Sequence, residues 1–145
     1  MKILVINGPN LNKLGERDIK QYGMLSLEEI NNLIRSEFTD IEFMFVQSNS
    51  EGEIIDYLQS VGNENIAGVI INPGGYAHSS VAIRDALELV KVPKIEVHLS
   101  NLANREDFRK QTLTASAVNG YLSGFGHLGY LAAVYLILKL TDNNI

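Results

Sequence analysis

An α/β fold built on one parallel sheet is indicated by two features of this sequence. Short apolar runs rich in branched residues alternate with stretches of helical period, which is the pattern of repeated βαβ units. Several of these runs are apolar at consecutive positions, as expected for strands that helices cover on both faces. The chain of 145 residues has no break in composition and no Ser/Gly-rich linker, so we expect a single domain over residues 1–145.

The apolar runs predict five strands, and the segments that follow the first two carry helix-capping signals. The strands are expected near residues 3–7, 41–47, 66–72, 94–98 and 119–123. Ser26 with Glu29, and Ser50 with Glu53, both fit a capping box, in which Ser accepts from the backbone amide three residues on while Glu reaches back. Together these elements predict a flavodoxin-like three-layer sandwich, a five-stranded parallel sheet with strand order 2-1-3-4-5.

Two further helices are predicted in the second half of the chain. Ser79 or Ser80 caps one that continues to about Val90, and Pro93 then forces the chain out of helix before the fourth strand. A final helix is expected over about residues 127–140. Core packing explains its apolar face better than a membrane or a cofactor does. The residues of that face are Leu131, Val134, Tyr135 and Leu138.

Composition excludes several functional classes. With 46% hydrophobic and 20% charged residues, the chain has enough apolar surface to bury a core. The formal charge of −5, with Lys and Arg scattered, leaves no basic face for a nucleic acid. The absence of cysteine excludes disulfides and cysteine-ligated metals. Apolar segments 2–7 and 131–138 are too short for a signal sequence or a bilayer span, so we expect a cytoplasmic protein without a membrane partner.

Each of the first four predicted strands runs into a polar turn. These turns are Asn7-Gly8-Pro9-Asn10-Leu11-Asn12, Ser48-Asn49-Ser50, Asn72-Pro73-Gly74-Gly75-Tyr76-Ala77-His78 and His98-Leu99-Ser100-Asn101. Ligands of open parallel sheets bind outside the carboxyl ends of the strands, where such turns converge. Because this edge is almost free of carboxylates, it favours an anionic or hydroxyl-rich ligand over a divalent cation.

The first turn, together with Leu14-Gly15, Arg17 and Tyr22-Gly23, resembles type II 3-dehydroquinate dehydratase, an enzyme of the shikimate pathway. Three later blocks carry the same resemblance: Gln47-Ser48-Asn49 with Glu51-Gly52; Ile71-Asn72-Pro73-Gly74 through Tyr76, His78, Ser80-Val81-Ala82 and Arg84-Asp85-Ala86-Leu87; and Glu96-Val97-His98-Leu99-Ser100-Asn101 with Arg105-Glu106, Phe108 and Arg109. The resemblance covers nearly the whole chain, in order. The departures are Lys13, Ile19, Gly75, Ala77 and Lys110, where the family usually has Leu, Pro, Ala, Thr and His.

The resemblance implies a hydro-lyase that dehydrates 3-dehydroquinate to 3-dehydroshikimate, reversibly and with trans geometry, in the route to chorismate and the aromatic amino acids. The reaction passes through an enolate and needs a base, an enolate stabiliser, an acid for the leaving hydroxyl and an anchor for the carboxylate. It needs no metal and no organic cofactor. The family forms dodecamers built from trimers, so a homo-oligomer is expected.

The resemblance assigns the base to Tyr22 and the acid to His98. A free phenol, with a pKa of about 10, is a poor base at neutral pH, so positive charge must lie nearby. Arg17, five residues earlier, is the first candidate for that charge and Arg109 the second. Glu96 shares a strand face with His98, because alternate side chains point the same way, and is expected to orient or charge the imidazole.

The remaining site residues are also assigned by resemblance. Asn10 is expected to help hold the enolate oxygen. The expected substrate-binding residues in the same subunit are Asn72, His78, Leu99, Ser100 and Arg109. The backbone amides of Leu99 and Ser100 suit a carboxylate, and Asp85 is expected to contact the substrate of a neighbouring subunit.

Two alternatives come from binding and signalling proteins. The segment Gly124-Phe125-Gly126-His127-Leu128-Gly129 is a literal G-x-G-x-x-G, but it opens the last helix and lacks the acidic residue about 20 positions onward that a dinucleotide site requires. Packing of that helix explains these glycines better. A phospho-receiver would need Asp where Asn72 stands, whereas a flavodoxin-like electron carrier predicts a yellow protein.

Two further alternatives concern catalysis. The histidines His78, His98 and His127 could in principle form a zinc site, although their spacings are long. A Schiff-base dehydratase would use Lys13 or Lys20, and borohydride trapping with substrate distinguishes it from a tyrosine mechanism.

Overall fold

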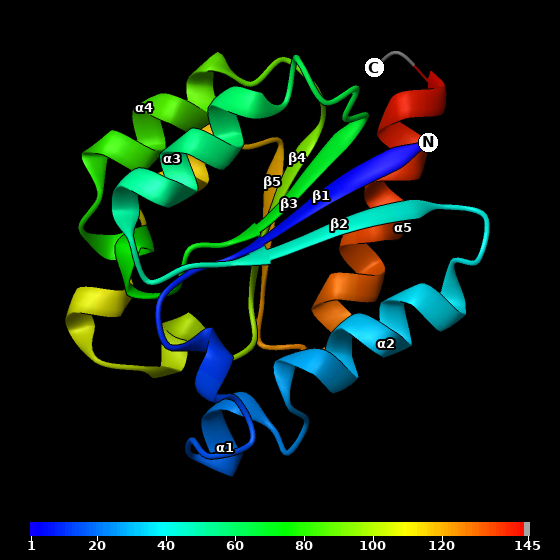
Figure 1. Cartoon of the computed structure of the whole chain (residues 1–145). Coiled ribbons are helices and arrows are strands. Elements are labelled where there is room, and N and C mark those ends of the chain that lie inside the picture. The colour runs from blue at the N-terminus through cyan, green and yellow to red at the C-terminus, as the bar shows by residue number, and fades with distance from the viewer. Residues whose placement is uncertain (144–145) are drawn as a thin grey trace.

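Five parallel strands form one sheet between two layers of helices in the computed structural model, which describes residues 1–143 (Figure 1). The strands are β1 (Lys2–Asn7), β2 (Glu42–Gln47), β3 (Gly68–Asn72), β4 (Lys94–His98) and β5 (Gly120–Ser123). Their order is β2-β1-β3-β4-β5, and every neighbouring pair is parallel. The predicted flavodoxin-like sheet and its strand order are therefore confirmed.

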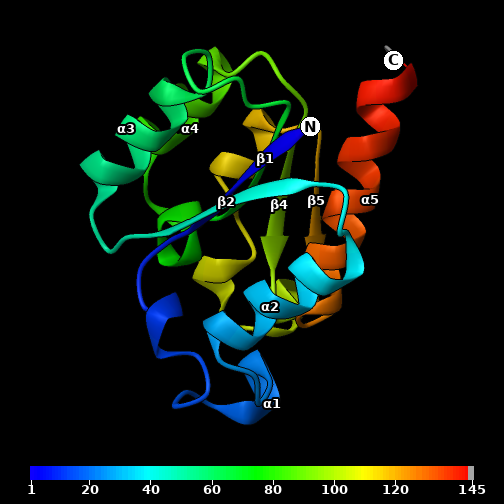
Figure 2. The same cartoon turned by 45° about the vertical axis from the view of Figure 1, so that its right-hand side comes forward.

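Four longer helices cover the two faces of the sheet. They are α2 (Leu27–Glu37), α3 (Glu51–Ser60), α4 (Val81–Leu89) and α5 (Leu128–Asn143). Helices α3 and α4 lie on one face, and α2 and α5 on the other (Figures 1 and 2). A short helix α1 (Ile19–Tyr22) lies between β1 and α2, and five 3₁₀ segments occupy the loops: Leu11–Lys13, Gly74–His78, Leu102–Asn104, Asp107–Arg109 and Thr114–Ala117.

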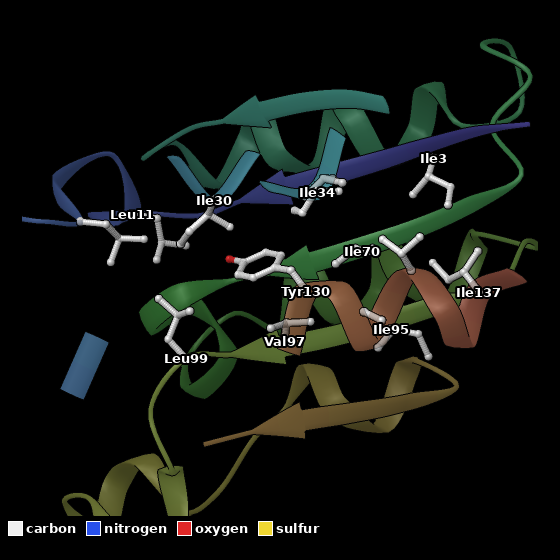
Figure 3. Packing of buried hydrophobic residues seen from close by; sticks show 14 residues of the cluster. Ile3, Leu11, Ile30, Ile34, Ile70, Ile95, Val97, Leu99, Tyr130 and Ile137 are labelled. Atoms are coloured by element: carbon white, nitrogen blue, oxygen red, sulfur yellow. The ribbon is translucent and has the colours of Figure 1, made fainter. Parts of the chain in front are cut away.

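The core consists of two apolar clusters, one on each face of the sheet. Strands β1 and β3 lie in the middle and are almost completely buried, whereas the edge strands β2 and β5 are partly exposed. Figure 3 shows the cluster beneath α2 and α5, in which branched aliphatic side chains surround the ring of Tyr130. Gly68 allows α5 to approach β3, since a Cβ there would lie 2.3 Å from Ile137 Cγ2.

Three of the predicted helix starts have serine caps, but only one is a full capping box. Ser26 accepts from the amide of Glu29, while the Glu29 carboxylate accepts from the amide of Ser26. Ser80 caps α4 through the amide of Ile83. The capping box predicted at Ser50 is wrong in its second half. Ser50 accepts from Glu53, but its own amide donates to Ser48 Oγ, and the Glu53 carboxylate accepts from a tyrosine hydroxyl instead.

The predicted packing face of α5 is correct for Val134, Leu131 and Leu138, which lie in or against the core, and wrong for Tyr135. Tyr130, Ala133, Val134 and Ile137 have no exposed surface, whereas Tyr135 is 55% exposed. Because α5 is apolar nearly all round, its sequence period does not select the inward face. No helix within residues 1–143 is both long and apolar enough to cross a membrane.

Candidate active site

The loops that follow β1, β3 and β4 meet the α1 segment around one pocket at the carboxyl edge of the sheet. All predicted site residues except Glu96 and Asp85 line it: Asn10, Arg17, Tyr22, Asn72, His78, His98, Leu99, Ser100 and Arg109. Pro9, Leu11, Gly74, Gly75, Leu102 and Arg105 complete the lining. The fold thus gathers residues from four separate segments at the edge where ligands of parallel sheets bind.

Close contact between the loops after β1 and β3 positions the first side of the pocket. The Gly8 amide donates to the Asn72 carbonyl at 2.8 Å, and a Cβ at Gly8 would lie only 2.6 Å from the Pro73 carbonyl oxygen. The next residue but one, Asn10, has a left-handed backbone with φ of 68°. Its amide donates to Asn49 Oδ1 at 3.0 Å, so the loop after β2 helps to hold this conformation.

Tyr22 ends α1 with its ring between two guanidinium groups. The Cζ atom of Arg17 lies 3.7 Å from the ring centroid, and that of Arg105 lies 5.3 Å from it. Arg105 is in turn held by Ser100, whose Oγ accepts from its Nη1 at 2.9 Å. The Tyr22 ring is therefore in contact with two guanidinium groups from different segments of the chain.

The second guanidinium at the Tyr22 ring belongs to Arg105, whereas we expected it to belong to Arg109. Arg109 lies over Phe108, at 5.2 Å from Cζ to the ring centroid, and its Nε donates to Glu106 at 2.8 Å. A hydrogen bond from its own backbone and the pairing with Arg109 lower the pKa of Glu106 below its ordinary value. Arg105 is four residues before Arg109 in the loop after β4, and its place in the block of residues that resembles the family was the sequence signal for its presence in the site.

His98 and Glu96 form a buried pair at the end of β4. His98 Nε2 lies 2.5 Å from Glu96 Oε1, and the carboxylate has no exposed surface. The expectation that they share a face of the strand agrees with this contact. His98 faces a second imidazole, since its ring centroid is 6.3 Å from that of His78, which is anchored through Nδ1 to the Gln111 carbonyl.

Asp85 lies outside this pocket, on α4. Its carboxylate is largely exposed and pairs with Arg84 at 3.4 Å. Within residues 1–143, therefore, the subunit does not bring Asp85 to its own site.

The residues on which the alternative hypotheses depend do not form the sites that those hypotheses require. Lys13 pairs with Glu16 at 3.5 Å, and neither Lys13 nor Lys20 lines the pocket. His127 does not join the other two histidines there, and no cluster of metal-binding side chains occurs in the described part of the chain. Gly129 is the second residue of α5, and a Cβ there would lie 3.1 Å from Val97 Cγ1, which agrees with the packing role predicted for the glycine-rich segment.

The fold and this pocket define an α/β enzyme with an aromatic residue, paired cations and an imidazole–carboxylate pair at the carboxyl edge of a parallel sheet. Residues 1–138 match the model of the family described as dehydroquinase class II. The chain belongs to this family, and it is an enzyme of the hydro-lyase class.

Individual relatives agree with this assignment. The chain is 51% identical over 142 residues to the 3-dehydroquinate dehydratase of Fusobacterium nucleatum subsp. nucleatum, covering 94% of this chain and 97% of the relative. It is 50% identical to that of Thermotoga petrophila, covering 96% of each chain. The crystal structure of type II dehydroquinase from Butyrivibrio crossotus superposes with a TM-score of 0.93 at 46% identity, over 95% of this chain and 97% of that one.

Proposed function

We propose that this chain dehydrates 3-dehydroquinate to 3-dehydroshikimate in the shikimate pathway, as one catalytic domain in the cytoplasm. Membership of the class II dehydroquinase family supports this reaction. The observation that carries its mechanism is the meeting of Tyr22, with its two guanidinium neighbours, and His98 in one pocket.

In the proposed first step, the phenolate of Tyr22 removes the proton alpha to the ketone. The electron pair of the broken C–H bond forms the enolate, and the phenolate oxygen takes up the proton to become a phenol. Arg17 and Arg105 stabilise the phenolate before this step, because their charges lie over its ring. Asn10 helps to hold the enolate oxygen, in a backbone conformation fixed by Asn49.

In the proposed second step, the enolate re-forms the ketone and the bond from the neighbouring carbon to its hydroxyl breaks. His98 gives its proton to the departing hydroxyl, so the second product is water. Glu96, buried against the imidazole, stabilises the protonated ring and fixes its orientation. Over one turnover Tyr22 gains the substrate proton and His98 loses one to the leaving hydroxyl, so proton exchange with solvent restores both groups before the next cycle.

The other pocket residues are proposed to bind the substrate. The backbone at Leu99 and Ser100, with the amide of Asn72, receives the carboxylate, while His78 and Arg109 contact ring hydroxyls. Only the Nε of Arg109 is bonded to Glu106, so the donors on its two Nη atoms are proposed to contact the substrate. Asp85 is proposed to reach the site of a neighbouring subunit in a trimer, within a dodecamer.

An ultraviolet assay tests the proposed reaction, because dehydration creates a conjugated enone acid that the substrate lacks. Purified wild-type protein is mixed with 3-dehydroquinate, and the product absorbance is followed. We expect a continuous rise that ends at the equilibrium of the reversible reaction. A well-folded protein that forms no enone acid would remove the proposed function.

A further inference from the structure

Asn72, at the carboxyl end of β3, lines the pocket with only 3% of its surface exposed. Its side-chain amide is held from two sides. Oδ1 accepts from the backbone amide of Gly74 at 3.1 Å, and Nδ2 donates to the hydroxyl of Tyr130 at 3.0 Å. The amide nitrogen carries a second proton, which neither contact uses.

Tyr130 reaches Asn72 from the first turns of α5 and is itself completely buried. Its hydroxyl points toward the carboxyl ends of the strands, out of the aliphatic cluster (Figure 3). There it donates to Asn7 Oδ1 at 2.6 Å. Burial raises the pKa of Tyr130, whereas the hydrogen bond from Asn72 lowers it to a smaller extent. The hydroxyl therefore keeps its single proton at physiological pH.

In this series of hydrogen bonds, each group can be donor or acceptor in only one way. The Gly74 amide can only donate, so the oxygen of Asn72 must face it and the nitrogen must face Tyr130. The Tyr130 hydroxyl then accepts from Asn72, which leaves its proton for Asn7. If the Asn72 amide turned over, its NH₂ group would face the Gly74 N–H, and two donors would oppose each other. The Gly74 amide on one side and the Tyr130 hydroxyl on the other thus fix the positions of Oδ1 and Nδ2 in the Asn72 side chain.

We infer that Tyr130 is a positioning residue, which fixes the Asn72 amide so that a proton donor faces the pocket. A donor selects an acceptor-only group of the ligand, of which a carboxylate is the strongest example. This inference rests on the proposed function for the identity of that carboxylate. Tyr130 touches neither the pocket surface nor the reacting atoms, and it acts through Asn72.

The variant Tyr130→Phe keeps the ring in the core and removes only the hydroxyl. We expect KM for 3-dehydroquinate to rise about tenfold, the factor for loss of one hydrogen bond to a charged group, with a much smaller change in kcat. Tyr57→Phe is the matched control. It also loses a hydroxyl that donates a hydrogen bond, to Glu53, but on the exposed surface of α3. The control should retain the wild-type KM.

A double-mutant cycle with Asn72→Ala separates positioning from general loosening of the core. If Tyr130 acts through Asn72, the substitution Tyr130→Phe changes KM little once the amide is gone. An equal rise of KM in both backgrounds would overturn the inference, as would a wild-type KM in Tyr130→Phe alone.

A nuclear magnetic resonance measurement keeps the test independent of turnover and of the variant's folding. In the ligand-free wild-type protein, one Nδ2 proton of Asn72 should exchange slowly with solvent and the other rapidly. Rapid exchange of both protons would overturn the inference even in an active enzyme. Absence of turnover by the wild type would instead reject the proposed function, and this measurement would still decide the role of Tyr130.

Discussion

The guanidinium carbon of Arg17 lies 3.7 Å from the centroid of the Tyr22 ring, although the two residues are separated by a turn and most of helix α1. Asp18 caps that helix by accepting from the amide of Lys20 at 3.0 Å. The cap fixes the chain between the cation and the phenol. The contact therefore depends on local backbone structure as well as on attraction between charge and ring.

Replacing Arg17 with Gln should lower kcat about 10²-fold, because the phenolate loses its nearer positive charge. Arg105→Gln should have a smaller effect on kcat, since its guanidinium lies farther from the ring. Steady-state kinetics with 3-dehydroquinate checks both variants, and circular dichroism checks their folding. Arg35→Gln is a control, because Arg35 lies over Phe45, away from the pocket. Wild-type kcat in both site variants would contradict the proposed role of the cations.

Glu96→Gln should lower kcat about tenfold to a hundredfold with little change in KM. The amide keeps the size of the buried side chain but removes the negative charge beside His98. The comparison variant is Glu53→Gln, which removes a carboxylate from the exposed side of α3. A Glu96→Gln enzyme with the kcat of the wild type would show that the carboxylate does not support the acid.

Asp85 can be tested by mixing two impaired subunits. We expect Tyr22→Phe and Asp85→Ala proteins each to have low activity. In hybrid oligomers, an intact Tyr22 from one chain can meet an intact Asp85 from another, so activity should exceed the average of the two parents. The measurement is the activity of coexpressed, differently tagged subunits purified by both tags. Activity equal to the parental average would place Asp85 outside the neighbour's site.

The buried hydroxyl of Tyr130 should make the free energy of unfolding depend on pH in the alkaline range. Its pKa is raised by burial in the folded state, whereas the unfolded chain has the ordinary value of about 10. The stabilisation is therefore complete below about pH 10 and decreases as the pH rises toward the folded value.

Urea unfolding of the wild type and Tyr130→Phe at several pH values checks this sign. At neutral pH, the variant should be less stable by about 1–3 kcal/mol, because Asn7 and Asn72 lose their buried partner. The difference in free energy of unfolding should shrink as the pH rises above about 10. A difference that stays constant over this range would mean that Tyr130 has an ordinary pKa in the folded protein.

The sheet and the edge that carries the site were predictable, because both depend on local patterns. Consecutive branched residues mark the buried strands, and the polar turns after β1, β3 and β4 mark the edge where the pocket lies. Serine caps identified the start of α2, α3 and α4. Each of these signals acts over a few residues, so a single sequence contains it.

Other features depend on contacts between distant residues. The inward face of α5 was predicted only in part: because apolar residues surround the helix, the sequence did not show that packing on the sheet buries Tyr130 and leaves Tyr135 exposed. Hydrogen bonds join Tyr130 to Asn72, which is 58 positions away in the sequence, and to Asn7, which is 123 positions away. Arg105 and Arg109 lie in one irregular loop, which has no repeating period to show which of the two side chains lies over Tyr22.

The central claim is that the Tyr22 phenol removes the substrate proton, and the most direct measurement is the ultraviolet assay applied to Tyr22→Phe. Tyr135→Phe is the matched control, because that side chain is exposed on α5 and does not line the pocket. The account predicts that Tyr22→Phe folds normally but loses at least about 10²-fold in kcat, while Tyr135→Phe forms the enone acid at the wild-type rate. Undiminished turnover by Tyr22→Phe would contradict the account and require another base.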